Sequence, residues 1–311
     1  MIFISFIMAI APAIFLVWYY YRQDKEKPEP KGLITKIFFI GFASIIPAII
    51  IELIFDAVAK STASLPILYY FIKAFIVAGF IEESLKLFIV KKFVYNDIHF
   101  DEVMDGIVYA IMASMGFACF ENVLYVLDGG WSVALLRAFT AVPLHAVTAG
   151  IMGYYIGKAK FTENAEDENS LIIKGLLVAV FIHGLYDFIL FSMPEFGKES
   201  GLIVIPLIIV CFFVLRRKIK LAIEDDEREG RTTEEFTMNR IMSLTSSELD
   251  FNRMSRSELR KHLELEGIQR KHGIIQSSVQ PEQNYNDSNK EQTDSNSDNI
   301  IENGQKGTIS D

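Results

Sequence analysis

The sequence predicts an all-α protein, a polytopic bundle of membrane-spanning helices. Apolar residues make up 51% of the 311-residue chain. They gather in blocks of about 20 residues, the length that a helix needs to cross a bilayer. Each block is a continuous apolar run instead of the alternating pattern of a half-buried strand. Lipid offers backbone groups no hydrogen-bond partner, so each run is expected to form a helix.

Seven apolar blocks are predicted as transmembrane helices. They span residues 2–21, 34–55, 66–90, 104–127, 133–157, 171–192 and 201–215. The first is expected to be an uncleaved anchor, because basic residues such as Arg22 and Lys31 follow the apolar run.

Basic residues indicate how the helices are oriented. Clusters such as Lys91 with Lys92 and Arg216 with Arg217 recur at every second loop, whereas the intervening loops have one basic residue each, Arg137 being an example. The positive-inside rule therefore predicts a multi-pass protein of the plasma membrane, with its N-terminus outside and its C-terminus in the cytoplasm.

The chain changes in character after its last apolar block. Residues 1–215 are predicted to form the membrane domain. Residues 216–272 are predicted to be a charged cytoplasmic segment with short helices, since Thr245–Glu248 and Ser255–Glu258 have capping-box spacing. Residues 273–311 are rich in Asn, Gln, Ser and Asp and poor in large apolar residues, so we expect a disordered tail.

Two features exclude whole classes of protein. The two cysteines, Cys119 and Cys211, lie inside apolar blocks, so no disulfide framework is expected. The chain has no Gly-rich phosphate loop and no Cys/His tract with metal spacing, and its basic residues lie at the ends of apolar blocks. Because the basic residues lie at membrane ends, nucleic acid is not a predicted partner. The predicted partner is the lipid bilayer.

Charged residues inside the third block indicate function. A charged side chain near the middle of a span costs about 2.5–3.5 kcal/mol on insertion scales. The third block nevertheless carries Glu82, Glu83 and Lys86. On a helix, Glu82 and Lys86 lie one turn apart and can pair, while Glu83 points about 100° away. We therefore expect one carboxylate to be neutralised and the other to be free to move a proton.

Polar residues also occur in the next three blocks. They are Glu121, Asn122 and Tyr125 in the fourth block, His145 in the fifth, and His183 and Asp187 in the sixth. Tyr125 lies one turn from Glu121 and can hydrogen-bond it, and Asp187 can likewise fix the tautomer of His183. Side chains from four helices can converge only inside the bundle, which is how helical bundles build a site.

Structural roles are the alternative for each of these residues. A Glu–Lys pair can join helices, and a lone intramembrane histidine or the cluster around Glu121 can be a packing network. Asp105 is expected to cap the helix of the fourth block, and Gly153 and Gly157 belong to small-residue faces that let backbones approach. Four costly sites on consecutive blocks nevertheless favour a functional centre.

Carboxylates and imidazoles in a hydrated pocket can hydrolyse a peptide bond. A Glu acts as general base on a water, and His or Lys donors stabilise the oxyanion that forms. The same residue types can hold Zn²⁺ with an open position, although the chain has no HExxH motif. They can also relay protons in a transporter, although the sequence has no convincing inverted repeat of the kind that many transporters carry.

Four motifs in order resemble the PrsW family of intramembrane proteases. They are EESLK at Glu82–Lys86, DGIVYAIMASMGFACFENVLYV at Asp105–Val126, PLHAVTAG at Pro143–Gly150 and HGLYDF at His183–Phe188. That family is similar in turn to the clan of the CAAX-prenyl endopeptidases. The resemblance covers roughly residues 5–215 and leaves the cytoplasmic tail without a counterpart.

The resemblance implies a protease that cuts membrane-anchored proteins, and the best-known role in the family is the first cut in an anti-sigma factor during a stress response. It implies catalytic roles for Glu82, Glu83, Glu121, His145 and His183, with Lys86, Asn122, Tyr125 and Asp187 in support. The family has been labelled both metalloprotease and glutamate-type protease, and we expect the glutamate type. If a metal such as Zn²⁺ is bound, the expected ligands are Glu82, Glu83, His145 and His183.

Overall fold

The computed structural model of the protein describes residues 2–24, 27–233, 235–237 and 239–240. Regular structure in these residues is entirely helical, as predicted. The helices are α1 (Ile2–Tyr21), α2 (Lys31–Ala43), α3 (Ile45–Ala59), η1 (Lys60–Thr62), α4 (Pro66–Phe71), η2 (Ile72–Phe80), α5 (Ile81–Phe93), α6 (Val103–Phe139), α7 (Ala141–Lys160), α8 (Ala165–Phe191), α9 (Met193–Phe196), η3 (Lys198–Ile203) and α10 (Val204–Arg228). The predicted tail, residues 273–311, and both predicted capping boxes lie outside the described residues.

Helix length and composition support a membrane protein. Within the described residues, three helical stretches are long and apolar enough to cross a bilayer: Lys31–Thr62, Val103–Lys160 and Ala165–Phe191. Large apolar side chains also face outward, with Leu53 67% exposed and Phe213 63% exposed. Such a surface is suited to lipid. The all-helical membrane architecture is thus confirmed, and the count of seven crossings stays a prediction.

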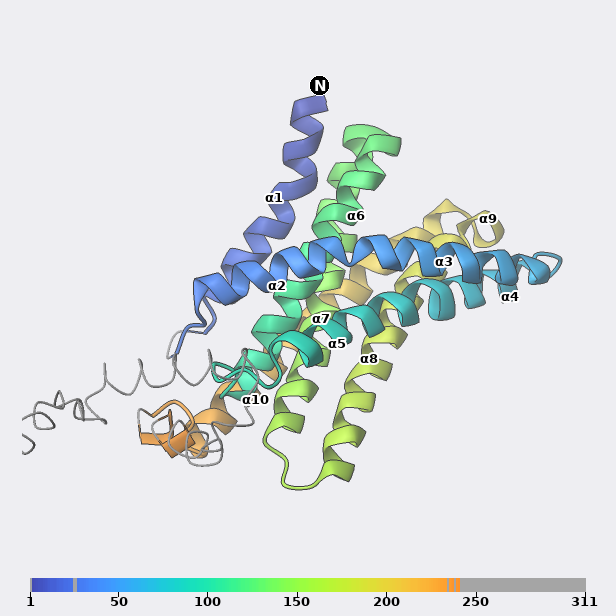
Figure 1. Cartoon of the computed structure of the whole chain (residues 1–311). Helices are drawn as coiled ribbons and strands as arrows, with labels where there is room; N and C mark the ends of the chain where they lie inside the picture. Colours follow the sequence, from blue (N-terminus) through green and yellow to red (C-terminus); the bar gives the residue numbers. More distant parts are fainter. Residues whose placement is uncertain (1, 25–26, 234, 238, 241–311) are drawn as a thin grey trace, which may run out of the picture. The chain divides into compact units, whose positions relative to one another are not determined.

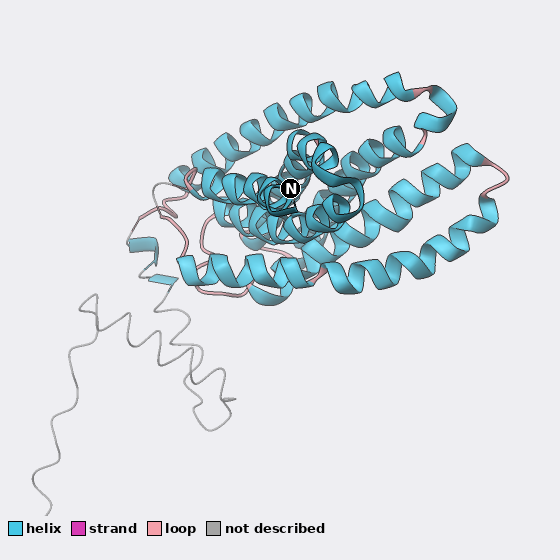
Figure 2. Ribbon diagram, turned by 90° about the horizontal axis from the view of Figure 1, so that it is seen from above, coloured by secondary structure: helices cyan, strands magenta, loops and turns pink. Residues whose placement is uncertain are grey.

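Helix α6 lies at the centre of the bundle. Every residue from Val103 to Cys119 is buried, and α1, α2 and α7 pack around this part of the helix (Figures 1 and 2). The backbones of α6 and α7 come very close, because a Cβ added to Gly106 would lie 2.4 Å from the carbonyl oxygen of Gly153. The small-residue face predicted in the fifth block therefore packs against α6.

The end of α6 differs from the prediction. Arg137 was expected in a loop, but the helix continues to Phe139 and the break comes at Thr140. Gly130 provides a sharp bend with φ 71°, a region that favours glycine. Arg137 Nε then lies 2.9 Å from Asn122 Oδ1, although a straight helix would separate residues 15 positions apart by about 22 Å. The last part of α6 therefore folds back along the same helix.

Two long helical stretches, α2–α3 and α4–η2–α5, run obliquely across α7 and α8 (Figure 1). Helix α3 packs on η2 and α5, and α8 packs on η2 from another side. The structure also extends α10 beyond the predicted end of the seventh block, to Arg228. This extension contains Leu, Arg, Lys and Glu, which have high helix propensity, so the helix continues beyond the end of the apolar run.

Candidate active site

The charged residues predicted from four separate blocks meet at one place in the bundle. Helix α5 provides Glu82, Glu83 and Lys86, α6 provides Glu121, α7 provides His145, and α8 provides His183 and Asp187. Upright helices would hold Glu82 and Glu121 at depths about 14 Å apart, given the 1.5 Å rise per residue. The oblique course of α4–η2–α5 closes this gap, and His145 joins the two carboxylates: its Nδ1 lies 4.0 Å from Glu82 Oε2 and its Nε2 lies 2.9 Å from Glu121 Oε2.

A π-helix positions the two glutamates. The nine residues of η2 come directly before α5, so Glu82 and Glu83 lie in the first turn that follows the π-helix. π-Helical turns occur frequently at functional sites. Gly79 in η2 allows a close approach to α8, because a Cβ at that position would lie 3.2 Å from the backbone nitrogen of Gly184. This approach brings Glu83 within reach of His183.

Glu83 is the neutralised carboxylate of the pair. It is fully buried, and its Oε1 accepts a hydrogen bond of 2.7 Å from Lys86 Nζ and lies 2.8 Å from His183 Nδ1. The predicted pairing of Lys86 with Glu82 is only secondary, since that distance is 3.4 Å. The i,i+3 geometry brings Glu83 nearer to Lys86 than the i,i+4 geometry brings Glu82.

The hydrogen-bond network assigns the tautomer of His145 and places one proton on Nδ1 of His183. Lys86 Nζ lies 3.0 Å from His145 Nδ1, and an ammonium group can only donate, so Nδ1 accepts and Nε2–H donates to Glu121. His183 Nδ1–H donates to Glu83, which leaves its Nε2 facing Asp187 Oδ2 at 3.4 Å and Glu82 Oε2 at 3.9 Å. Glu83 therefore orients His183 more closely than Asp187 does.

A cavity of ≈ 420 Å³ opens onto these groups. Its walls include Glu82, Glu121, His145, His183 and Asp187, together with apolar side chains of α3, η2, α7 and α8. This volume is typical of a pocket that holds a ligand segment. Glu83 and Lys86 do not line the cavity and lie behind it.

Four charged residues in the cavity wall escaped the sequence analysis: Glu52, Asp56, Lys73 and Arg137. Glu52 of α3 has a buried Oε1 without a hydrogen-bond partner among the described residues. Arg137 Nη2 forms an ion pair of 2.8 Å with Glu121 Oε2, although not with hydrogen-bond geometry. Glu52 lies inside a predicted apolar block, so the insertion-cost argument applied to Glu82 would have identified it. The predicted connection at residues 128–132 implies that the chain reverses there, but no sequence signal places Arg137 beside Glu121.

Asn122 and Tyr125 support Arg137 instead of touching the histidines. Asn122 Nδ2 donates to the carbonyl oxygen of Ala9 at 2.8 Å, while its Oδ1 accepts from Arg137. The guanidinium of Arg137 lies 3.9 Å from the ring centroid of Tyr125. The expected hydrogen bond between Tyr125 and Glu121 is not among those formed by the described residues, since Tyr125 is half-exposed and turns its ring to Arg137.

The side chains at this site include carboxylate and imidazole groups that can bind a metal ion. Glu82, His145 and His183 each offer a ligand atom, and the three atoms lie within 4.8 Å of one another, a set that resembles the three protein ligands of catalytic zinc. Glu83 would then hold the ring of His183 from behind, as carboxylates do for metal-bound histidines. One contact opposes this use, because the ammonium of Lys86 occupies Nδ1 of His145 and would have to move away.

Comparisons with known proteins identify the family of the chain. Residues 29–215 match the family model described as PrsW family intramembrane metalloprotease. The chain is 34% identical to a Geobacillus kaustophilus protein named Protease PrsW over 68% of this chain and 89% of that protein. It is 38% identical to Protease PrsW of Bacillus subtilis over 60% of this chain and 82% of that protein. No solved structure matches the chain.

Proposed function

The chain belongs to the PrsW family of intramembrane proteases, and from this premise we propose that Glu82 activates the water that hydrolyses the substrate's peptide bond. One observation carries the proposal: of the two adjacent glutamates, only Glu82 lines the cavity, while Glu83 lies behind it. Glu82 also has the looser partner, with Lys86 Nζ at 3.4 Å compared with 2.7 Å for Glu83. Its carboxylate is therefore free to take a proton.

The neighbouring residues have distinct roles in this proposal. Water adds to the peptide carbonyl carbon as Glu82 takes its proton, and Glu82 then returns that proton to the leaving amine nitrogen. Arg137 and Lys73 both line the cavity, and we assign Arg137, which lies beside Glu121, to stabilise the negative oxygen that forms. Glu83 and Lys86 act as positioning residues, because they fix His183 and His145 without facing the cavity.

A metal, if bound, would be held by Glu82, His145 and His183. A Zn²⁺ ion supplies two effects in such a site, since it lowers the pKa of a bound water and polarises a carbonyl oxygen. The residues of this chain would still determine the rest: Glu83 orients His183, and Glu121 holds His145 through its Nε2.

Substrate class follows from the surroundings of the site. The cavity lies among helices whose outer faces are apolar, so the substrate is a membrane-anchored protein that reaches the site from the bilayer. In line with the best-known role in the family, we propose an anti-sigma factor as the substrate. We further propose a multi-pass plasma-membrane protein with an external N-terminus and a cytoplasmic C-terminus, in agreement with the distribution of basic residues.

Conservative substitutions test the role of Glu82. Purified Glu82→Gln protein, assayed on a membrane-anchored substrate in liposomes, is expected to lose about 10²–10⁴-fold in turnover, the usual contribution of a general base. Glu224→Gln is the matched control, because Glu224 is exposed on α10 far along the chain from the cavity residues. Wild-type turnover in Glu82→Gln would refute the proposal.

A further inference from the structure

A second group of buried carboxylates lies where the α1–α2 connection meets α6 and α10. Its members are Asp24, Glu29, Asp101, Glu102, Asp105 and Asp226. Each of the six is at most 5% exposed. None of them lines the active-site cavity. Six buried carboxylates in one place require compensation, because buried charge is costly unless it is paired.

Basic side chains compensate only part of this group. Lys27 pairs with Asp101 at 2.5 Å, and Arg231 pairs with Asp226 at 2.6 Å. Asp226 also accepts the backbone N–H groups of Val103 and Met104. Arg240 adds a positive charge near Asp101 and Asp105.

The other carboxylates are left without a bonded cation. Among the described residues, no ion pair involves Asp24, Glu29, Glu102 or Asp105. Glu29 instead accepts a hydrogen bond from the Tyr109 hydroxyl, and Asp105 accepts the backbone N–H groups that cap α6.

Three carboxylate oxygens point to a missing ligand. Asp24 Oδ2, Glu102 Oε1 and Asp105 Oδ1 are buried and have no hydrogen-bond partner in the described part of the chain. Leaving such an atom unsatisfied costs about 1–3 kcal/mol, and more when the group is charged. Burial raises the pKa of Asp24 to about 7 and that of Glu102 to about 8, which reflects the same electrostatic cost.

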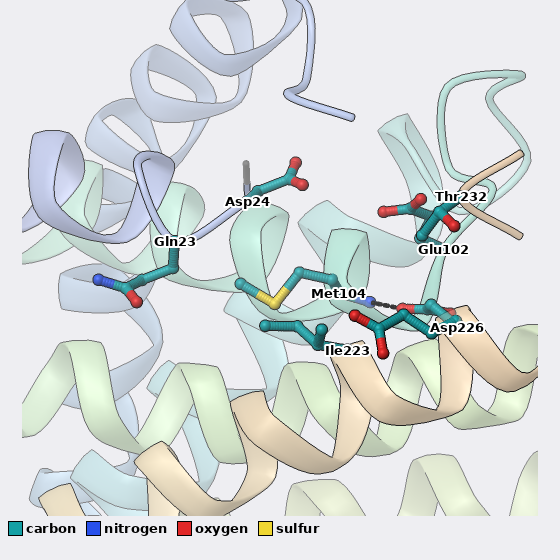
Figure 3. A pocket seen from close by; sticks show the side chains of 8 residues that line it. Gln23, Asp24, Glu102, Met104, Ile223, Asp226 and Thr232 are labelled. Atoms are coloured by element: carbon teal, nitrogen blue, oxygen red, sulfur yellow. Dashed lines mark hydrogen bonds between the residues drawn. The ribbon is translucent and has the colours of Figure 1, made fainter. Parts of the chain in front are cut away.

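The geometry suits a single ion. Asp24, Glu29 and Asp105 each offer an oxygen, and these oxygens lie within 4.8 Å of one another. A cavity of ≈ 250 Å³ adjoins them and is lined by Asp24, Glu102 and Asp226 (Figure 3). This cavity gives room for water molecules, which a small divalent cation retains in its coordination shell.

We propose that Asp24, Glu29 and Asp105 bind a hard divalent cation of the Mg²⁺ or Ca²⁺ class, at a site separate from the active site. The ligand set consists of carboxylate oxygens alone, which such cations prefer, whereas the active site presents imidazole nitrogens. The cation joins the segment after α1 to the first turn of α6, the central helix of the bundle. It therefore stabilises the end of the bundle without taking part in hydrolysis.

Metal binding is measured on the full chain carrying Glu82→Gln, which removes a donor from the active-site set and stops proteolysis. After chelator treatment in detergent, Mn²⁺ is added as a spin probe and free Mn²⁺ is followed by electron paramagnetic resonance. We expect saturable binding that Mg²⁺ or Ca²⁺ displaces, and the stronger competitor identifies the preferred ion. Added Mg²⁺ or Ca²⁺ is also expected to raise Tm by several degrees at constant ionic strength, as a ligand of the folded state does.

Two variants locate the ion, and one controls for charge. Asp24→Asn and Glu29→Gln, each added to Glu82→Gln, are expected to weaken Mn²⁺ binding by about tenfold or more, because ligand charge sets the affinity of such sites. Glu224→Gln removes an exposed carboxylate and is expected to leave binding unchanged. Comparable elution on size exclusion shows which variants are folded.

Absence of saturable Mn²⁺ binding, or an affinity in both ligand variants equal to that of the Glu82→Gln parent, would overturn the proposal. Either result would favour a proton shared between Glu29 and Asp105 as the compensating charge. The proposed role of Glu82 in hydrolysis does not depend on either result.

Discussion

Lys86 is the residue on which the charge balance of the active site depends. Its ammonium is fully buried and contacts Glu83, Glu82 and His145 at 2.7, 3.4 and 3.0 Å. Lys86 is therefore the common neighbour of both adjacent glutamates and one histidine. Loss of this one side chain affects three others.

Replacement of Lys86 with methionine is expected to destabilise the protein by about 3–5 kcal/mol, because it leaves Glu83 as a buried charge with one partner fewer. The measurement is thermal unfolding in detergent. The double variant Lys86→Met/Glu83→Gln removes both charges and is expected to recover most of the lost stability. If the single variant is as stable as wild type, Glu83 does not carry the charge assigned to it.

Arg137 is predicted to contribute to turnover. Arg137→Gln is expected to lower kcat by about 10²-fold, the effect of removing one donor to a developing oxyanion. Tyr125→Phe is the matched variant, because the ring that Arg137 contacts stays and only the hydroxyl is lost. We expect near wild-type kcat for Tyr125→Phe. A large loss of kcat in this variant would instead favour the hydrogen bond between Tyr125 and Glu121 that the sequence suggested.

At the level of residues, the sequence reveals charges that are costly in a membrane but not their partners. Glu82, Glu121 and His145 stand out because each interrupts an apolar run. Spacing along one helix predicted that Lys86 pairs with Glu82, but the shorter contact is to Glu83. Contacts such as His183 to Glu83, 100 residues apart, depend on how helices pack, and no local spacing encodes them.

For the helices, the sequence predicts where they lie along the chain, whereas packing determines where they bend or break. Continuous apolar runs predicted the positions of the main helices, because lipid forces such runs to satisfy their own hydrogen bonds. The bend at Gly130 lies in the connection predicted between the fourth and fifth blocks, residues 128–132, whereas the break at Thr140 was not predicted. A glycine between two apolar runs indicates a connection, but only contacts such as Arg137 with Asn122 show how closely the chain returns along the helix.

The α6–α7 interface gives a prediction at this scale. Gly106→Leu is expected to prevent correct packing, because its Cβ would lie 2.4 Å from a backbone oxygen and 2.6 Å from a backbone nitrogen of α7, and backbone atoms cannot rotate away. Gly32→Ala is the control, since nothing lies within 4 Å of the added Cβ. The measurement is the yield of monodisperse protein on size exclusion. Equal yields for Gly106→Leu and Gly32→Ala would contradict the close approach of the two helices.

For the whole molecule, composition and apolar patterning were sufficient to predict a helical membrane protein. Four motifs were sufficient to predict its family, which the comparisons confirm. Orientation in the membrane stays a prediction from basic residues, because helix packing alone has the same geometry in either direction.

Thiol labelling tests that orientation. Ser64→Cys lies in the exposed α3–α4 connection and Glu163→Cys in the exposed α7–α8 connection. The predicted topology places position 64 outside the cell and position 163 in the cytoplasm. A membrane-impermeant thiol reagent added to intact cells is therefore expected to label Ser64→Cys and spare Glu163→Cys until the cells are lysed. The native cysteines, Cys119 and Cys211, are buried and give little background. The reverse pattern would invert the predicted topology.

The π-helix η2 allows the orientation of α5, and with it that of the active-site glutamates, to change. A π-helical turn contains more residues than an α-helical turn, so η2 holds extra residues just before Glu82 that a change in winding can add or remove. If the π-helix absorbed one further residue, α5 would rotate by about 100° about its own axis. Such a rotation would bring Glu83 toward the position that Glu82 now occupies, so two glutamates in succession let the pocket keep a carboxylate in either winding of the helix.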